Sequence, residues 1–510
     1  MVVALKQGPW VLENQRVCSS HGGHVIDSRK HTSRAQNTFV ILVIVVVVVL
    51  VWQFAAFQYA LARMPNGWTV ANAPATGQTP QQVVLKLRTA FSQPVTLRYR
   101  SETLPLSPEE VDFKLDEAAT LQSLSDVRAG ASGAQGFLHF LIRRTPPPRD
   151  VPAVTTYSEE KLRAFLTRVT ERYDQAPTGP SPLVDELRFA QGQPGNELEI
   201  SASVPVIATA LRSADKREAN LVVKTVPSVT PRLRLLRDLL DAYLKRRFIG
   251  QAGVFVKDLQ TGEEIGINDS VAFSGMALLK IPILTETYRR LSELPDGATL
   301  NLVSQVATGE ASNTAANTLL QQLGDDDAYA GADRLNASMR YLGLVNTFIA
   351  TPFDQNVTPP AVVTQANSRT DINTNPDPRM QTTPQDMGLM LEMVYLCARG
   401  GGTLMLAYPN AFTEPKCRQM LDLLSQGNLT NPTGGAPMFI RAGLPAETRV
   451  ANKWGFDKET RGNAAVVFTS NGDFILAIFL RQADWGDWQK ASPMMADITK
   501  ATYNYFTLSR

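Results

Sequence analysis

Histidine is nearly absent from this chain, and its absence limits the chemistry available. The sequence has 4 histidines among 510 residues, and none follows His139. The other three, His21, His24 and His31, lie near the N-terminus. Beyond position 139 the chain therefore has no Ser-His-Asp triad and no metal site with a histidine ligand.

Cysteine is also scarce, and 3 residues are too few for a disulfide framework. Cys397 and Cys417 fall on predicted helices, where they could pair, although we expect buried thiols. Neither has a histidine partner inside its domain, which argues against a Cys-His nucleophile. Cys18 lies close to His21 and His24, a spacing that could suggest metal ligands. Its polar, Gly-rich surroundings instead favour a disordered tail without a metal.

Strong charge is lacking too. The net charge is +2 at pH 7, and no basic run suggests a nucleic-acid partner. We also find no phosphate-binding Gly loop, and we expect no cofactor.

One long apolar run stands out near the N-terminus. Phe39 to Val51 is unbroken, and the apolar character continues to Leu61, roughly the 20 residues that span a bilayer as a helix. We predict a transmembrane helix over residues 38–61, with Trp52 and Tyr59 suited to the membrane interface. Ala60-Leu61-Ala62 resembles a signal-peptide cleavage site, but the long polar lead-in favours an uncleaved anchor.

The distribution of basic residues predicts the orientation of this helix. Only Arg63 carries a positive charge in the ~20 residues that follow, so the positive-inside rule places the N-terminus in the cytoplasm. Residues 1–37 would form a cytoplasmic, disordered tail, and everything after the helix would be extracytoplasmic. The basic residues that precede the run are Lys6, Arg16, Arg29, Lys30 and Arg34.

A flexible linker is predicted over residues 62–80, followed by a small α+β domain over residues 81–228. Helical patterns cover 81–91, 158–173 and 204–211, and strand patterns cover 95–100, 137–142 and 220–225. The domain resembles the peptidoglycan-binding domain found before VanW-type and L,D-transpeptidase modules. The resemblance is carried by Pro94–Tyr99, Leu106–Glu110 and Phe189–Glu199. The alternative is a spacer domain that binds nothing.

Residues 229–510 have the pattern of an α/β domain with two subdomains. A helix to Arg247 precedes a strand-turn-strand signal over 253–266. Helices dominate from 277 to 424, strands return over 450–453, 464–469 and 474–480, and a last helix begins at Ser492. A sheet flanked by helices, with a helical subdomain inserted between its halves, accounts for this order.

The segment Phe273-Ser-Gly-Met-Ala-Leu-Leu-Lys280-Ile-Pro282 resembles the Ser-x-x-Lys element of class A serine β-lactamases and penicillin-binding proteins. Lys280 is present, but Ala277 stands where the family has its nucleophile. Ser274 is six residues from Lys280, too far for the one-turn spacing that this pair needs. The resemblance implies a β-lactamase-like fold, an antiparallel sheet flanked by helices plus a helical subdomain, without its attacking hydroxyl.

Three further segments match the family and depart from it. In Glu310–Asn317, aligned on Thr314-Ala-Ala-Asn317, the Ser-Asp-Asn element becomes Ala311, Ser312 and Asn313, so a proton-handling hydroxyl is lost. The omega-loop region, Pro352 to Pro384, has no glutamate to activate a deacylating water. Its only acids are Asp354, Asp371 and Asp377.

The last segment is Val450-Ala-Asn-Lys453-Trp-Gly455, which resembles the Lys-Thr-Gly strand. Trp454 replaces the threonine, and its indole is expected to fill part of the groove. Because two lysines would repel, we expect Asn side chains or backbone carbonyls around them. The predicted groove residues are Ser274, Lys280, Ser312, Asn313, Lys453, Trp454 and Gly455.

Together these features predict a membrane-anchored pseudoenzyme with a serine hydrolase fold. It would bind peptidoglycan, wall peptides or a protein partner at the cell wall. The alternative is an active serine hydrolase, a β-lactamase or a peptidoglycan peptidase or transpeptidase, that uses Ser274 or Ser312. A third possibility is a structural protein whose groove binds nothing.

Overall fold

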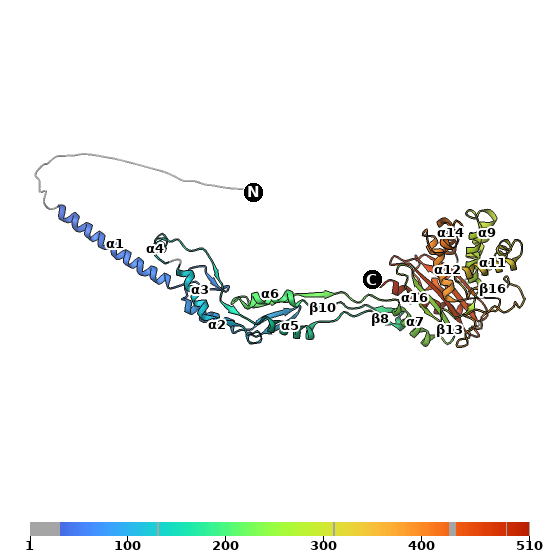
Figure 1. Ribbon diagram of the computed structural model, residues 1–510, viewed down its shortest axis with the longest axis horizontal. Helices are drawn as coiled ribbons and strands as arrows, with labels where there is room; N and C mark the ends of the chain where they lie inside the picture. The colour runs from blue at the N-terminus through green and yellow to red at the C-terminus, as the bar shows by residue number, and fades with distance from the viewer. Residues whose placement is uncertain (1–30, 130–131, 310–311, 428–434, 486, 509–510) are drawn as a thin grey trace, which may run out of the picture. The chain divides into compact units, whose positions relative to one another are not determined.

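The computed structural model describes residues 31–129, 132–309, 312–427, 435–485 and 487–508. The predicted disorder of the N-terminal tail, and the candidate ligands Cys18, His21 and His24, lie outside these residues. The chain divides into two compact units (Figure 1). The first includes residues up to Asp174 together with Glu197–Lys224, and the second comprises Gln175–Asn196 and Thr225–Arg510.

The first unit begins with the apolar helix α1, His31–Leu61. Within it, Thr38–Leu61 is long and apolar enough to cross a membrane, and its most apolar window is not buried by the protein. Helix α1 starts at His31, so residues 31–37, which were predicted to belong to a disordered tail, are helical. Side chains such as Phe39, Ile44 and Trp52 are largely exposed, as expected for residues that would face lipid.

The rest of the first unit is a small α+β fold around its own apolar core. Helix α2 begins with a capping box, in which Thr79 and Gln82 satisfy each other's backbone N–H groups, and with Pro80 in its first turn. Helix α5 is capped by Ser158. The elements are β1 (Thr69–Val70), β2 (Ala73–Pro74), α2 (Pro80–Phe91), β3 (Val95–Tyr99), β4 (Glu102–Leu106), η1 (Pro108–Val111), β5 (Lys114–Leu115), α3 (Glu117–Ala129), α4 (Ala134–Leu141), β6 (Asp150–Val151), β7 (Thr155–Thr156), α5 (Glu159–Tyr173), β10 (Gly195–Leu198), α6 (Ile200–Leu211), β11 (Glu218–Asn220) and β12 (Val223–Val226).

Two sequence-based predictions for this unit were wrong. The segment 62–80 is folded, because Met64, Trp68 and Val70 are buried in the core and β1 pairs with β6. The segment predicted as a strand over 137–142 forms most of helix α4 instead. In both places apolar partners distant in sequence determine the structure.

A five-stranded antiparallel sheet organises the second unit, with the strand order β14-β13-β20-β19-β18. Its strands are β13 (Gln251–Asp258), β14 (Glu264–Ile267), β18 (Val450–Phe456), β19 (Thr460–Val467) and β20 (Phe474–Arg481). The order joins strands from both ends of the domain, as the two-subdomain pattern predicted. Helices pack on both faces of the sheet (Figure 1).

Side chains alternate between two cores on the opposite faces of this sheet. On β20, Ile475, Ala477 and Phe479 join the core formed with the helical subdomain. Leu476, Ile478 and Leu480 join the core formed with α7 and α16. The helices α7 (Arg234–Arg247) and α16 (Ser492–Phe506) cover that second face.

The helical subdomain covers the first face, and α12 contacts β13, β19 and β20 directly. Thr383 caps α12 and Pro384 occupies its first turn, as expected for a helix start. The remaining elements are β15 (Phe273–Ser274), η3 (Met276–Leu279), α8 (Lys280–Arg290), α9 (Gly297–Thr308), α10 (Asn313–Leu323), α11 (Ala328–Tyr341), β16 (Phe348–Ile349), β17 (Met380–Thr382), α12 (Pro384–Cys397), α13 (Thr403–Ala407), α14 (Glu414–Ser425), α15 (Phe439–Ala442) and η4 (Trp488–Ala491).

Cys397 and Cys417 form a disulfide between α12 and α14, with their Cα atoms 5.7 Å apart. The expectation of two separate buried thiols was therefore wrong. Local sequence could not show that the end of α12 meets the start of α14.

The segment 175–196 belongs to the second unit, although the sequence assigned it to the domain before. It forms the hairpin β8 (Ser181–Leu183) and β9 (Arg188–Ala190). Phe189 contacts Tyr505 of α16, with ring centroids 5.8 Å apart. Leu187 and Phe189 are buried in the core beside α7 and α16, so this hairpin packs with the sheet domain.

Candidate functional site

Ala277 lies at the start of the short helix η3, directly against the edge strand β18. A Cβ added to Gly455 of β18 would lie 2.7 Å from the Ala277 backbone nitrogen, so only glycine allows this approach. Met276, the residue before Ala277, has a positive φ of 52°, a conformation that is costly for a side chain of this size. The backbone is thus held tightly at the position where the sequence predicted the missing nucleophile.

Lys280 follows at the start of α8, and its side chain is almost completely buried. The ammonium donates a hydrogen bond to Ser312 Oγ at 3.0 Å and lies 5.2 Å from the centre of the Phe353 ring. Burial lowers the pKa of Lys280 to about 8, and the charge of Asp354 partly opposes this shift. The lysine is therefore held where a change in its protonation is possible near neutral pH.

Ser312, to which the alignment did not give this role, supplies the hydroxyl that contacts Lys280. The alignment gave this role to Ala311 and concluded that the hydroxyl was lost. Ala311 lies outside the described residues, and Ser312 stands directly before α10 with its Oγ also donating to the Gly309 carbonyl at 3.2 Å. A hydroxyl is thus present beside Lys280.

Lys453 extends from β18 toward the same loop. Its ammonium donates to the carbonyl oxygens of Gly309 at 2.9 Å and Ala307 at 3.3 Å. The Gly309 carbonyl therefore accepts from both Lys453 and Ser312. The expectation that backbone carbonyls would surround a buried lysine is confirmed for Lys453, while Lys280 contacts a hydroxyl and an aromatic ring.

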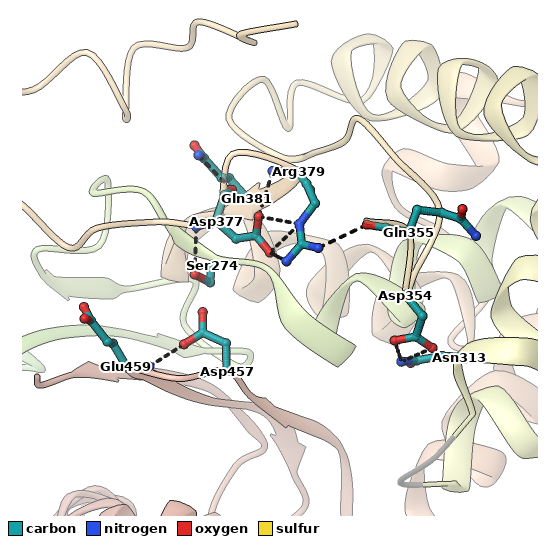
Figure 2. Close-up of polar contacts among 9 residues, drawn as sticks. All are labelled: Ser274, Asn313, Asp354, Gln355, Asp377, Arg379, Gln381, Asp457 and Glu459. Carbon is teal, nitrogen blue, oxygen red and sulfur yellow. Dashed lines mark hydrogen bonds and ion pairs between the residues drawn. The ribbon is translucent and has the colours of Figure 1, made fainter. Parts of the chain in front are cut away.

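The segment after Pro352 is fixed to α10 by amide side chains. Asn317 exchanges two 2.9 Å hydrogen bonds with the backbone of Phe353. Asn313 Nδ2 contacts both carboxylate oxygens of Asp354, at 3.0 and 3.1 Å (Figure 2). Phe353, an apolar side chain, consequently faces the Lys280 ammonium. Sequence reasoning missed both Asn317 and Phe353, and the retained Thr314-Ala-Ala-Asn317 match was the signal that could have pointed to Asn317.

The other two acids of the omega-loop region have structural partners. Asp371 pairs with Arg369, and Asp377 pairs with Arg379. The backbone N–H of Asp377 also donates to Ser274 Oγ at 2.9 Å (Figure 2). Of the three aspartates, Asp354 is the one whose charge acts on Lys280.

Ser274 lies on β15 and is 1% exposed. The hydrogen bond that Ser274 accepts from the Asp377 backbone holds the omega-loop region. Among the described residues, no hydrogen bond joins Ser274 to Lys280. Ser274 therefore has the surroundings of a loop anchor.

Trp454 directs its indole away from the Lys453 side of β18. Successive side chains of a strand point to opposite faces. The ring lies 5.1 Å from that of Phe439 and stacks on that of Phe456 at 5.9 Å, and it packs against the core beside α7 and α16. These contacts do not show the expected filling of the groove.

Within the described residues, no group of three or more histidine, cysteine or acidic side chains is placed to hold a metal ion. The arrangement instead offers two buried ammonium groups, those of Lys280 and Lys453, with the Ser312 hydroxyl between Lys280 and the Gly309 carbonyl that Lys453 also contacts. These groups can bind carbonyl or carboxylate oxygens and move a proton. The methyl of Ala277 has no lone pair with which to attack a carbonyl.

The fold and this lysine-lined site define a serine β-lactamase-like or penicillin-binding-protein-like domain. The model of the β-lactamase enzyme family matches residues 235–302 and 291–506, which together are more than half of the chain. The chain belongs to this family. Among curated proteins, none matches it.

Several solved structures are similar to about half of this chain. A variant of the last common ancestor of Gram-negative bacteria β-lactamase class A is 25% identical, with a TM-score of 0.40, over 52% of this chain and 97% of that one. An ancestral class A β-lactamase is 22% identical, with a TM-score of 0.39, over 52% and 98%. A PBP-A mutant, solved as an acyl-enzyme complex with penicillin G, is 19% identical, with a TM-score of 0.40, over 55% and 99%.

Proposed function

We propose that this chain is a membrane-anchored, extracytoplasmic binding protein whose β-lactamase-like domain has lost covalent catalysis. The observation that carries this proposal is the methyl group of Ala277, located one helical turn from Lys280 where the family has its nucleophile. The omega-loop region offers Phe353, not a glutamate, beside Lys280. Acylation and the activation of a deacylating water would both lack their essential group.

The proposed ligand is a peptide or glycan of the cell wall. Lys280 lies one helical turn after Ala277 and Lys453 two residues before Gly455, and two cations there would favour ligands that present carboxylate or carbonyl oxygens. The first unit would add wall contacts of its own, consistent with its compact core and with the resemblance of residues 81–228 to a peptidoglycan-binding domain. The ligand class itself rests on analogy with the family.

The exposed helix α1 supports anchoring in a membrane. The disulfide between Cys397 and Cys417 supports an extracytoplasmic location, because disulfides persist in oxidising compartments. With the excess of basic residues before α1, both observations favour an N-terminus in the cytoplasm.

Sedimentation with purified peptidoglycan sacculi tests wall binding. The full chain in detergent micelles should pellet with sacculi and remain soluble without them. Lys453→Met should weaken retention if the groove binds, whereas Lys500→Met, an exposed lysine of α16, should not. The absence of any retention would overturn wall binding.

A second candidate is a serine hydrolase that uses Ser312. The 3.0 Å contact between Lys280 Nζ and Ser312 Oγ favours it, because a lysine with a pKa of about 8 is partly neutral at pH 7 to 8 and can accept a proton. Against it, Ser312 is only 4% exposed and donates to the Gly309 carbonyl. Labelling by a fluorescent penicillin that disappears in Ser312→Ala would establish this activity.

A further inference from the structure

The short helix α4 of the first unit has an apolar side that the protein does not cover. Residues 134, 137, 138 and 141 follow the i, i+3, i+4 and i+7 spacing of one helical face, and Phe140 widens that face. No residue of α4 is buried. Leu138 is 58% exposed and Ile142, directly after the helix, is 63% exposed. Gly136 and His139 lie away from this face, whereas Gln135, seven residues before Ile142, lies on the same side as Ile142.

Helix α4 lies beside the end of α1 (Figure 1), and aromatic rings make the contact. Phe137 lies 5.6 Å from Phe54 and 5.3 Å from Phe57, and Phe140 lies 5.5 Å from Phe57, measured between ring centroids. Phe57 is only 5% exposed as a result. The two phenylalanines of α4 thus face α1, and the neighbouring leucines stay open.

The position along α1 places this contact at the level of a membrane surface. At 1.5 Å per residue, a helix that enters the hydrocarbon near Thr38 leaves a layer of about 30 Å near residue 57 or 58. Trp52 and Tyr59, which are both well exposed, flank this level. The open face of α4 therefore continues the apolar surface of the candidate span at its outer end.

The segment that contains α4 carries only positive charge between Asp126 and Asp150. Residues 127–149 contain four arginines and no aspartate or glutamate. Arg143, Arg144 and Arg149 are exposed, and no side-chain ion pair or hydrogen bond is found for them within the described part of the chain. Two of these arginines directly follow the exposed Ile142, so apolar and cationic groups lie side by side, as in helices that bind at membrane interfaces.

We propose that α4 is an interfacial helix that lies in the headgroup region of an anionic bilayer. Leu138, Leu141 and Ile142 would enter the boundary of the acyl chains, and Arg143 and Arg144 would bind lipid phosphates. This inference rests on the proposed membrane anchoring by α1. It adds a second contact, which would hold the first unit against the membrane surface.

Fluorescence quenching by lipid-borne nitroxides tests this placement. The full chain with Cys18→Ser, which retains the Cys397–Cys417 disulfide, would carry one added cysteine and one fluorophore in nanodiscs of phosphatidylglycerol and phosphatidylcholine. Labels at Leu138→Cys and Ile142→Cys should be quenched. Labels at His139→Cys, on the polar side of α4, and at Leu85→Cys, an exposed leucine of α2, should not.

A label at Val48→Cys in α1 separates the two ways in which the test can fail. If Val48→Cys is quenched and Leu138→Cys behaves like Leu85→Cys, the interfacial helix is overturned and the anchor stands. If Val48→Cys is not quenched, anchoring by α1 is overturned, and the inference that depends on it fails too.

A charge arm tests the proposed lipid chemistry. The double variant Arg143→Gln with Arg144→Gln should weaken the binding of α4 to the anionic bilayer. The equilibrium constant for this binding should fall by about fivefold for each arginine removed. Lys86→Gln with Arg172→Gln, which removes two cations from α2 and α5, should leave the quenching unchanged. Equal quenching of Leu138→Cys in pure phosphatidylcholine and in anionic discs would overturn the requirement for anionic lipid.

Discussion

The protonation of Lys280 links the candidate site to the stability of the fold. Its pKa of about 8 in the folded chain lies below the ordinary value of 10.5, with burial as the main cause. The unfolded chain therefore binds more protons between pH 8 and 10.5, and the contribution of Lys280 to the free energy of unfolding rises over that window. Below pH 8 the full cost of burying the charge remains.

Lys280→Met removes this dependence and provides the comparison. We compare the free energy of unfolding of the unmodified chain with that of Lys280→Met. The difference, unmodified minus variant, should rise by about 3 kcal/mol between pH 8 and 10.5. Denaturant unfolding at a series of pH values measures the difference, in which other titrating groups cancel. A difference that stays constant over the window would show that the pKa is not lowered.

Gly455 is the residue at which the site tolerates no side chain. Gly455→Ala places a methyl group 2.7 Å from the Ala277 backbone nitrogen, so β18 and η3 must move apart. We expect a loss of about 1–3 kcal/mol in the free energy of unfolding, as for other overpacked positions. Gly401→Ala, where an added Cβ has no atom within 4 Å, is the matched control. Equal stability of the two variants would contradict the close approach.

Much of this site follows from sequence, since Ala277, Lys280 and Lys453 are fixed by short motifs within single elements. The identity of the hydroxyl that contacts Lys280 does not follow from sequence. The path of the loop before α10 decides which residue reaches the lysine. A shift of one residue cannot be resolved by motif alignment. Phe353 likewise meets Lys280 through hydrogen bonds to Asn317, a contact across 36 residues.

Between elements, the Cys397–Cys417 disulfide joins α12 to α14 across a sequence separation of 20 residues. A cross-link that closes such a loop stabilises by about 3 kcal/mol in the chain-entropy account. Cys397→Ala with Cys417→Ala should lower the free energy of unfolding by about this amount, measured by denaturant titration. A reductant should destabilise the unmodified chain and leave the double variant unchanged. If the reductant leaves the free energy of unfolding of the unmodified chain unchanged, the Cys397–Cys417 disulfide is contradicted.

The helices and strands differ in how well local pattern predicts them. The strands of the five-stranded sheet and the capped helices α2, α5 and α12 are recognisable because period and caps agree. Helix α4 was not recognisable from its local pattern, because a short apolar run such as Phe-Leu-His-Phe-Leu-Ile fits a helix or a strand equally well. Its partners, Phe54 and Phe57 on α1, are about 80 residues away.

For the whole chain, Cys18 offers a test of orientation in the membrane. With Cys397 and Cys417 paired, it is the one remaining thiol in the sequence. If the N-terminus is cytoplasmic, a membrane-impermeant maleimide should leave Cys18 unlabelled on intact cells and label it after lysis. Labelling on intact cells, absent in Cys18→Ser, would reverse the proposed orientation.

Reaction with a fluorescent penicillin tests the central proposal, the loss of the nucleophile, most directly. The unmodified chain should remain unlabelled, because Ala277 cannot form an acyl bond. Ala277→Ser, measured beside it, should be labelled, since Lys280 and Ser312 are already in contact. Its adduct should persist, because no glutamate is present to activate a deacylating water. Covalent labelling of the unmodified chain, abolished by Ser312→Ala, would contradict the account.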